Sequence, residues 1–141
     1  MADPRNAVNH LAKYRAMTYP HDDTIVYSAT EENGSAQVGL AVTIESDNLI
    51  SLVGSGEQVE GKLIKVESDG FCVVQVEGEM TLPGGTSATL TAGLKIVGDL
   101  LGSAEGYIQA VSTEDTVSRG TIIDASTTTA VVVRLESGAS N

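Results

Sequence analysis

The chain has 141 residues, a formal net charge of −11 and a single cysteine. A chain of this length can bury about two thirds of its unfolded surface in one domain, so it needs neither a disulfide nor a metal to fold. The excess of acidic residues repels phosphate and argues against nucleic-acid binding, and no apolar run is long enough to span a membrane. The first residues lack the apolar centre of a signal peptide, so we expect a soluble protein made in a cytoplasm.

The residue types favour strands over helices. Valine, isoleucine and threonine together number 38, and glycine adds 15. β-branched residues separated by frequent turn-forming residues are typical of many short strands. We therefore predict an all-β protein, a small barrel or sandwich of short antiparallel strands.

Residues 1–22 form an N-terminal arm that differs from the rest of the chain. Asp3 and Pro4 are suited to the cap and first position of a helix, and the apolar residues that follow have helical spacing as far as Pro20. Residues 1–20 hold three basic residues and one acidic residue, whereas the rest holds five basic and eighteen acidic. We expect a partly helical arm that is mobile alone and becomes ordered on a partner. The alternative is that the arm packs on its own barrel or on a neighbouring protomer.

Residues 23–136 are expected to form the β-barrel domain, and residues 137–141 a flexible C-terminal tail. Turn signals divide the domain every eight to twelve residues or so, the rhythm of a sandwich or barrel. One of them is Asn33-Gly34, a pair suited to positive φ, which predicts a turn there. The expected strands are residues 24–29, 37–44, 49–53, 63–67, 71–77, 80–82, 88–91, 93–97, 106–111, 121–124 and 130–135.

A hairpin lies at the centre of this pattern. Residues 63–67 and 71–77 are two β-branched runs separated by a turn that contains Asp69 and Gly70. An Asp-Gly pair favours a primed turn in which both central residues have positive φ. In the second run Cys72 shares one face with two valines, and the opposite face also begins with apolar residues, so we expect a central strand.

The residue types that could support catalysis all have simpler structural explanations in this sequence. Cys72 lies on an apolar strand face and is expected to be a small buried hydrophobe. His10 and His21 lack companions at metal-ligand spacing. Glu77 and Glu79 share a strand face by period; such a carboxylate pair could serve glycoside hydrolysis, although a solvated face explains it more simply. We predict no enzyme activity, no catalytic residue, no cofactor and no metal.

Several phrases resemble one family in their order along the chain. They are Val59-Glu60-Gly61-Lys62-Leu63, Val74-Gln75-Val76-Glu77-Gly78, Thr91-Ala92-Gly93-Leu94-Lys95-Ile96, and Arg119-Gly120-Thr121-Ile122 followed by Val131-Val132-Val133-Arg134-Leu135. This order is similar to that of the small β-barrel capsid decoration (cement) proteins of tailed bacteriophages. The resemblance covers roughly residues 37–136, and the arm does not match the family pattern.

The resemblance implies a structural protein of the virion. Such proteins sit on the outer surface of the head, often as trimers, and clamp neighbouring major capsid protein subunits. We therefore expect the major capsid protein as partner, a homo-oligomer with a trimer favoured, and no nucleic acid or membrane partner. The family supplies no catalytic residues to carry over.

The residues expected to contact the capsid come from the arm. Its basic side chains could meet acidic groups and its tyrosines could act as anchors. The candidates are Arg5, Lys13, Tyr14, Arg15 and Tyr19.

Two other function classes stay open. A phage tail or fibre module, or a bacterial β-barrel module, could bind a receptor or a carbohydrate, and a cluster of aromatic side chains would favour it. A hydrolase that uses an acidic pair is the third reading.

Overall fold

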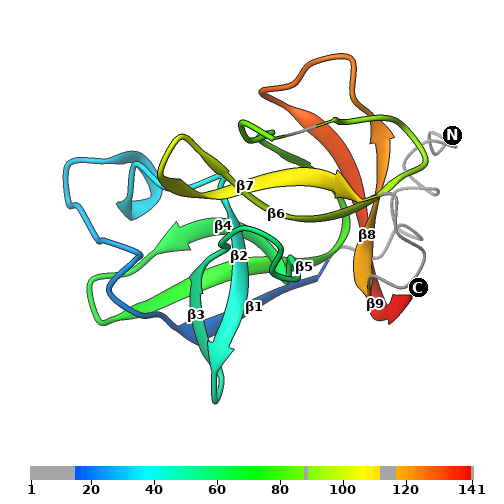
Figure 1. Cartoon of the computed structure of the whole chain (residues 1–141). Helices are drawn as coiled ribbons and strands as arrows, with labels where there is room; N and C mark the ends of the chain where they lie inside the picture. The colour runs from blue at the N-terminus through cyan, green and yellow to red at the C-terminus, as the bar shows by residue number, and fades with distance from the viewer. Residues whose placement is uncertain (1–14, 88, 112–116, 141) are drawn as a thin grey trace, which may run out of the picture.

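A computed structural model describes residues 15–87, 89–111 and 117–140, of which residues 137–140 are described by their backbone alone. The chain is all-β and its antiparallel sheet forms a nearly closed barrel (Figure 1), which confirms the predicted fold class. The elements are β1 (Arg15–Pro20), a single 3-10 turn η1 (Glu32–Gly34), β2 (Ala41–Ser46), β3 (Leu49–Leu52), β4 (Gly61–Val66), β5 (Phe71–Leu82), β6 (Lys95–Leu101), β7 (Ala104–Val111), β8 (Ser118–Asp124) and β9 (Val131–Ser140).

Strand β5 joins the two halves of the barrel. The strand order is β3-β2-β4-β5-β9-β8-β6-β7, and β1 pairs with β5 outside this path. The first half of β5 pairs with β1 and β4, and its second half, from Gly78 on, pairs with β9. Gly78 has φ 100°, a conformation that a residue with a side chain adopts only with strain, and it marks this change of partner. The expectation of a central strand is thus confirmed.

The loop between β3 and β4 closes the barrel against the β6–β7 hairpin. The amide of Gly98 in β6 donates to the carbonyl of Glu57 at 2.7 Å, and the Gly106 amide in β7 donates to Val53 at 2.8 Å. A Cβ on Gly98 would collide with the main-chain oxygen of Gly54. The glycine therefore allows two backbones to approach where they are not paired as strands.

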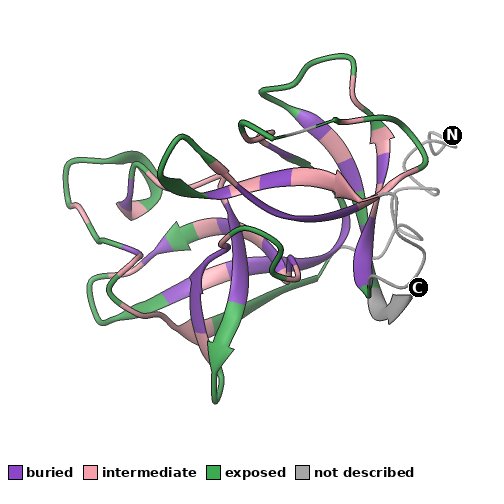
Figure 2. Ribbon diagram, viewed as in Figure 1, coloured by how far each residue is buried: buried purple, intermediate pink, exposed green. Residues whose placement is uncertain are grey.

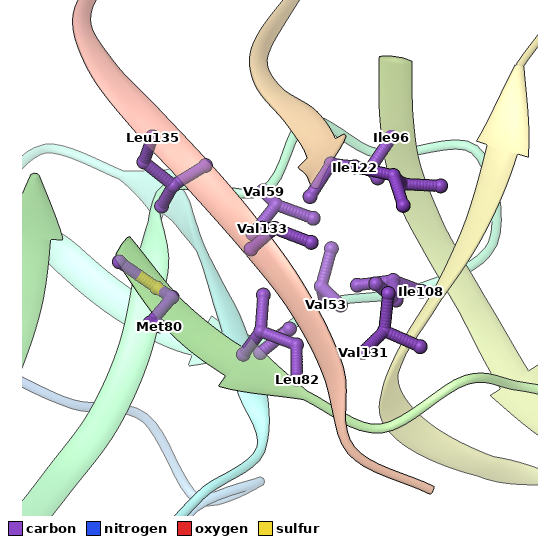
Figure 3. Packing of buried hydrophobic residues seen from close by; sticks show 11 residues of the cluster. Val53, Val59, Met80, Leu82, Ile96, Ile108, Ile122, Val131, Val133 and Leu135 are labelled. Atoms are coloured by element: carbon purple, nitrogen blue, oxygen red, sulfur yellow. The ribbon is translucent and has the colours of Figure 1, made fainter. Parts of the chain in front are cut away.

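Apolar side chains fill the barrel in two clusters, as the buried positions in Figure 2 indicate. One cluster, shown in Figure 3, gathers residues from β5, β6, β7, β8 and β9, among them Leu82, Ile108 and Val133. The other lies between β2, β3, β4 and the first half of β5 and includes Leu63, Cys72 and Val74. The face of β5 that carries Cys72 and Val74 is therefore the inner face, as its period predicted.

The predicted strand over residues 24–29 is wrong. The segment is irregular because side chains take the bonds that a neighbouring strand would supply. The Asp22 carboxylate accepts from the Thr24 amide at 3.0 Å, a bond that favours a turn. The Gln37 side chain accepts from the Val26 amide at 2.8 Å and donates to the Thr24 carbonyl at 2.7 Å. Residues 37–40, expected as strand, lie in a turn before β2, in which the Leu40 amide donates to the Gln37 carbonyl at 3.1 Å.

Other boundaries also differ from the prediction. Residues 89–91 are not a strand, and residue 88 lies outside the described residues. Residues 137–140, expected in the flexible tail, instead continue β9, where the backbone of Ser140 pairs with that of Ser118. The hairpin turn is present, but only Gly70 has positive φ (89°). The expected primed turn is therefore wrong. The Asp69 carboxylate instead accepts from the Phe71 amide at 3.2 Å, and this side-chain bond stabilises the turn.

Candidate binding surface

Of the five residues predicted to contact the capsid, three precede residue 15, where the described part of the chain begins, and two lie within it. Arg5, Lys13, Tyr14 and most of the predicted helix lie outside the described residues. Arg15 and Tyr19 belong to β1, which pairs with β5 from Glu77 to Phe71. For residues 15–20 the structure therefore has the alternative arrangement, in which the segment packs on its own barrel.

Both side chains already make contacts within the barrel. The Arg15 guanidinium lies 3.2 Å from the carboxylate of Glu77, whose side chain is almost fully buried. Tyr19 is half-buried and packs against the cluster that contains Cys72. Both residues help to hold β1 on β5, and only Arg15 keeps a largely exposed side chain.

The outer face of β1, β5 and β4 carries apolar and basic side chains. Cross-strand register places Thr18, Val73 and Lys65 in one row and pairs Pro20 with Phe71 in the next. Phe71 keeps 41% of its surface exposed, although a phenyl ring in water is unfavourable. We call these five residues the outer sheet face; it lies opposite the side chains that fill the barrel.

A shallow cleft of about 490 Å³ continues this surface beyond β4. We call it the outer cleft; its lining includes Tyr27, Glu31, Asn33, Lys65, Glu67 and Ser68. Lys65 belongs to both surfaces, and the Glu67 amide donates to the Phe71 carbonyl at 2.8 Å. The outer cleft and the outer sheet face therefore form one continuous surface.

Local backbone geometry builds the far wall of the outer cleft. Gly34 has φ 85°, and a Cβ there would collide with the main-chain oxygen of Val66. The absence of a side chain lets the segment 27–34 lie directly against β4. The Ser28 amide donates to the Gly34 carbonyl at 2.8 Å, which closes the segment into a compact loop. Tyr27 on this loop is 42% exposed. The Asn-Gly signal at residues 33–34 predicted the turn, but not its contact with β4.

A second polar feature, around Arg119 of β8, is buried rather than open. Its guanidinium donates to the carbonyls of Glu136, Glu60 and Val76 at 2.9, 2.8 and 2.7 Å, and lies 3.0 Å from the Glu60 carboxylate. Burial raises the pKa of Glu60 more than the neighbouring Arg119 charge lowers it. These bonds join β8 to β9, to β5 and to the loop before β4. The network is best explained as a structural clamp, since its donors already have protein partners.

The other residues considered as chemical groups do not come together. Cys72 is buried, and burial raises the pKa of its thiol to about 11, which disfavours the nucleophilic thiolate. Glu77 is buried beside Arg15 while Glu79 is exposed, so the two carboxylates lie in different surroundings. Within residues 15–87, 89–111 and 117–136, no three His, Cys, Asp or Glu side chains gather as metal ligands would.

Comparison with known proteins adds no family. No family model matches the chain, and no curated protein matches it. In the part of the chain that the structure describes, no helix has the length and apolar character needed to cross a membrane.

Proposed function

We propose that this protein is a phage head decoration protein, which binds the outside of the capsid across the joints between major capsid protein subunits and stabilises the shell. The single observation that carries the proposal is the location of the exposed side chains that could bind a partner. The barrel is filled by two apolar clusters, whereas aromatic, apolar and charged side chains of both signs are exposed together on the outer sheet face and the outer cleft. Such a surface suits contact with another protein.

The partner that we propose for this surface, the major capsid protein, is the one implied by the resemblance of residues 37–136 to decoration proteins. A protein that binds the assembled shell, and not separated subunits, stabilises the shell by mass action. Because many copies bind one shell, a modest binding free energy per copy is sufficient to stabilise it. Within each interface we expect the partly exposed Phe71 ring to contribute most, because aromatic anchors in the middle of a patch dominate protein interfaces.

A shell-binding assay tests the proposal. Purified protein is incubated with immature and with expanded shells of a phage that encodes it, and the bound fraction is measured by co-sedimentation. We expect binding to expanded shells, and substitution of Phe71→Ser to weaken it about tenfold or more. Leu101→Ser is the matched control, because Leu101 is also exposed (50%) but lies in the β6–β7 hairpin. No binding to either shell would refute the proposal.

One observation favours the receptor or carbohydrate module as a second candidate. Tyr27 presents a ring at the outer cleft together with carboxylate, amide and ammonium groups, and these are the groups that bind sugars. A panel of glycans measured with the wild type and with Tyr27→Ala distinguishes the candidates. Specific glycan binding that Tyr27→Ala abolishes, without binding to shells, would support the second candidate.

A further inference from the structure

Asn33 and Gly34, in the loop that forms the far wall of the outer cleft, are a chemically labile pair. Asn33 is exposed, lines the outer cleft and is the only asparagine in the sequence that glycine follows. In such a pair the main-chain nitrogen of glycine can attack the side-chain carbon Cγ of asparagine, because no side chain on the glycine hinders the approach. This reaction is one reason why asparagine is a thermolabile residue.

The reaction is a ring closure followed by a hydrolysis. A bond forms between the Gly34 nitrogen and Cγ of Asn33, the Gly34 nitrogen loses its proton, and the side-chain amide nitrogen leaves as ammonia. Water then opens the cyclic imide at one of its two carbonyl carbons. One opening gives aspartate, and the other gives isoaspartate, in which the main chain runs through the former side chain. Water is the only co-reactant, so no oxidant, metal or enzyme is needed.

The folded loop opposes this attack. Asn33 has φ 56° and ψ 22°, a left-handed conformation in which Cβ lies close to the carbonyl oxygen of its own residue. The Gly34 nitrogen therefore points away from the Asn33 side chain, and ring closure requires a large rotation of ψ. The Gly34 amide donates to the Glu31 carbonyl at 3.1 Å, and the Gly34 carbonyl accepts from the Ser28 amide at 2.8 Å. Gly34 also lies directly against the main-chain oxygen of Val66, which leaves little room for the rotation.

We propose that Asn33 is a deamidation site that the fold keeps closed: it reacts only when the loop 27–34 opens, and the product then prevents the loop from closing as before. Aspartate places a further carboxylate in the outer cleft beside Glu31 and Glu67. Isoaspartate adds a methylene group to the main chain, so Gly34 can no longer keep both its hydrogen bonds and its close approach to Val66. This inference does not rest on the proposed role on the capsid.

Peptide mapping by mass spectrometry tests the site. The full chain is incubated at mildly alkaline pH, folded in buffer and unfolded in urea, and the deamidated fraction is followed at each asparagine. Asn48 is the matched internal control, because it is exposed and has φ 61°, but Leu49 follows it. In urea Asn33 should react much faster than Asn48, and folding should slow Asn33 by about tenfold or more. Equal rates at the two asparagines in urea, or equal rates at Asn33 with and without urea, would overturn the proposal.

A variant that loosens the loop tests whether opening limits the reaction. Gln37→Ala removes two side-chain bonds to the backbone of residues 24–26, which lead into the loop, and leaves the reacting pair unchanged. It should raise the rate at Asn33 in the folded protein several-fold. Gln109→Ala, which removes a comparable bond between β7 and β6, should not. Circular dichroism confirms that both variants are folded, and a folded Gln37→Ala variant that reacts no faster than the wild type would overturn the proposal.

Hydrogen exchange at the Ser28 amide distinguishes the two products. Asn33→Asp adds the charge but keeps a normal main chain, so this amide should stay protected by its bond to the Gly34 carbonyl. Isoaspartyl protein, isolated by chromatography from aged material, should exchange the same amide faster, because the lengthened main chain cannot keep the bond. Equal protection in isoaspartyl and unmodified protein would contradict the claim that the modification holds the loop open.

Discussion

Arg119 and Glu60 are joined twice, through a main-chain bond of 2.8 Å to the Glu60 carbonyl and an ion pair of 3.0 Å to its carboxylate. They are 59 residues apart in the chain, and the contact fixes the loop before β4 to the start of β8. The two other carbonyls that accept from Arg119 belong to β5 and β9. One side chain thus connects three strands and the loop that closes the barrel.

Replacing Arg119 by alanine should be strongly destabilising. The substitution leaves three carbonyls and a partly buried carboxylate without their donor, and breaking such a network costs about 3–5 kcal/mol. Urea denaturation followed by circular dichroism measures the loss. The control is Arg134→Ala, an exposed arginine on the neighbouring strand β9, which we expect to change the free energy of unfolding by about 0.5 kcal/mol or less. Equal effects of the two substitutions would contradict the clamp.

Glu60 should make the protein less stable as the pH rises. Burial raises its folded pKa above the ordinary value of 4.5, so the folded state holds the proton over a pH range in which the unfolded state has lost it. This group's contribution to stability is therefore greatest below pH 4.5 and declines as the pH rises through the folded pKa. Glu60→Gln removes the titration. The difference in unfolding free energy, wild type minus variant, should fall over that range, and a difference that rises would contradict the prediction.

The thiol of Cys72 should be inert until the protein unfolds. It is fully buried, and its pKa is raised to about 11. A thiol reagent at neutral pH should react slowly with the native protein and quickly in denaturant. The raised pKa also means that stability is lost as the pH rises from 9.0 towards 11, because only the unfolded thiol ionises there. Fast native labelling with the fold intact would oppose this prediction.

Substituting Cys72 by serine and by alanine separates the effect of a polar group on stability from the effect of lost volume. Both substitutions remove the sulfur, but serine also places a hydroxyl on the inner face of β5. An unpaired buried hydroxyl costs about 1–3 kcal/mol, so Cys72→Ser should be less stable than Cys72→Ala by an amount in that range. Equal stability of the two variants would show that the hydroxyl finds a partner.

The sequence predicted the fold class and the central hairpin because those depend on local patterns. Alternation placed Cys72 and Val74 on the inner face, and the structure agrees. The prediction from alternation was wrong at residues 24–29, where Ile25, Val26 and Tyr27 suggested a strand. There a bond from a side chain thirteen residues away decides the backbone path, and no local pattern contains that information.

The candidate surface was harder to predict than the fold. The arm residues stood out by charge, yet Arg15 is paired with Glu77, a residue 62 positions later in the chain (77 − 15). The outer cleft needs Tyr27 to lie beside Lys65, which depends on how the segment 27–34 packs on β4. The Asn-Gly turn at residues 33–34 was the only signal in the sequence, and it predicts a bend without saying what the bend contacts.

The role of the N-terminal arm can be tested by two deletions that differ by one strand. Removing residues 1–14 leaves every described strand in place, so the barrel should unfold cooperatively with nearly the stability of the full chain. Removing residues 1–20 also removes β1. This exposes one edge of β5 along residues 71–77 and uncovers the cluster that contains Tyr19 and Cys72.

Shell binding then distinguishes the arm from the barrel surface. If Arg5, Lys13 and Tyr14 bind the capsid, the deletion of residues 1–14 should bind much more weakly than the full chain while its fold stays intact. Binding by the full chain should also weaken at high salt, because salt screens the attraction between the basic side chains and acidic groups. The longer deletion should lose several kcal/mol of stability, because removing β1 uncovers the apolar cluster under Tyr19 and each Å² of apolar surface newly exposed costs about 25 cal/mol. Unchanged shell binding after the shorter deletion would assign the contact to the barrel instead of the arm.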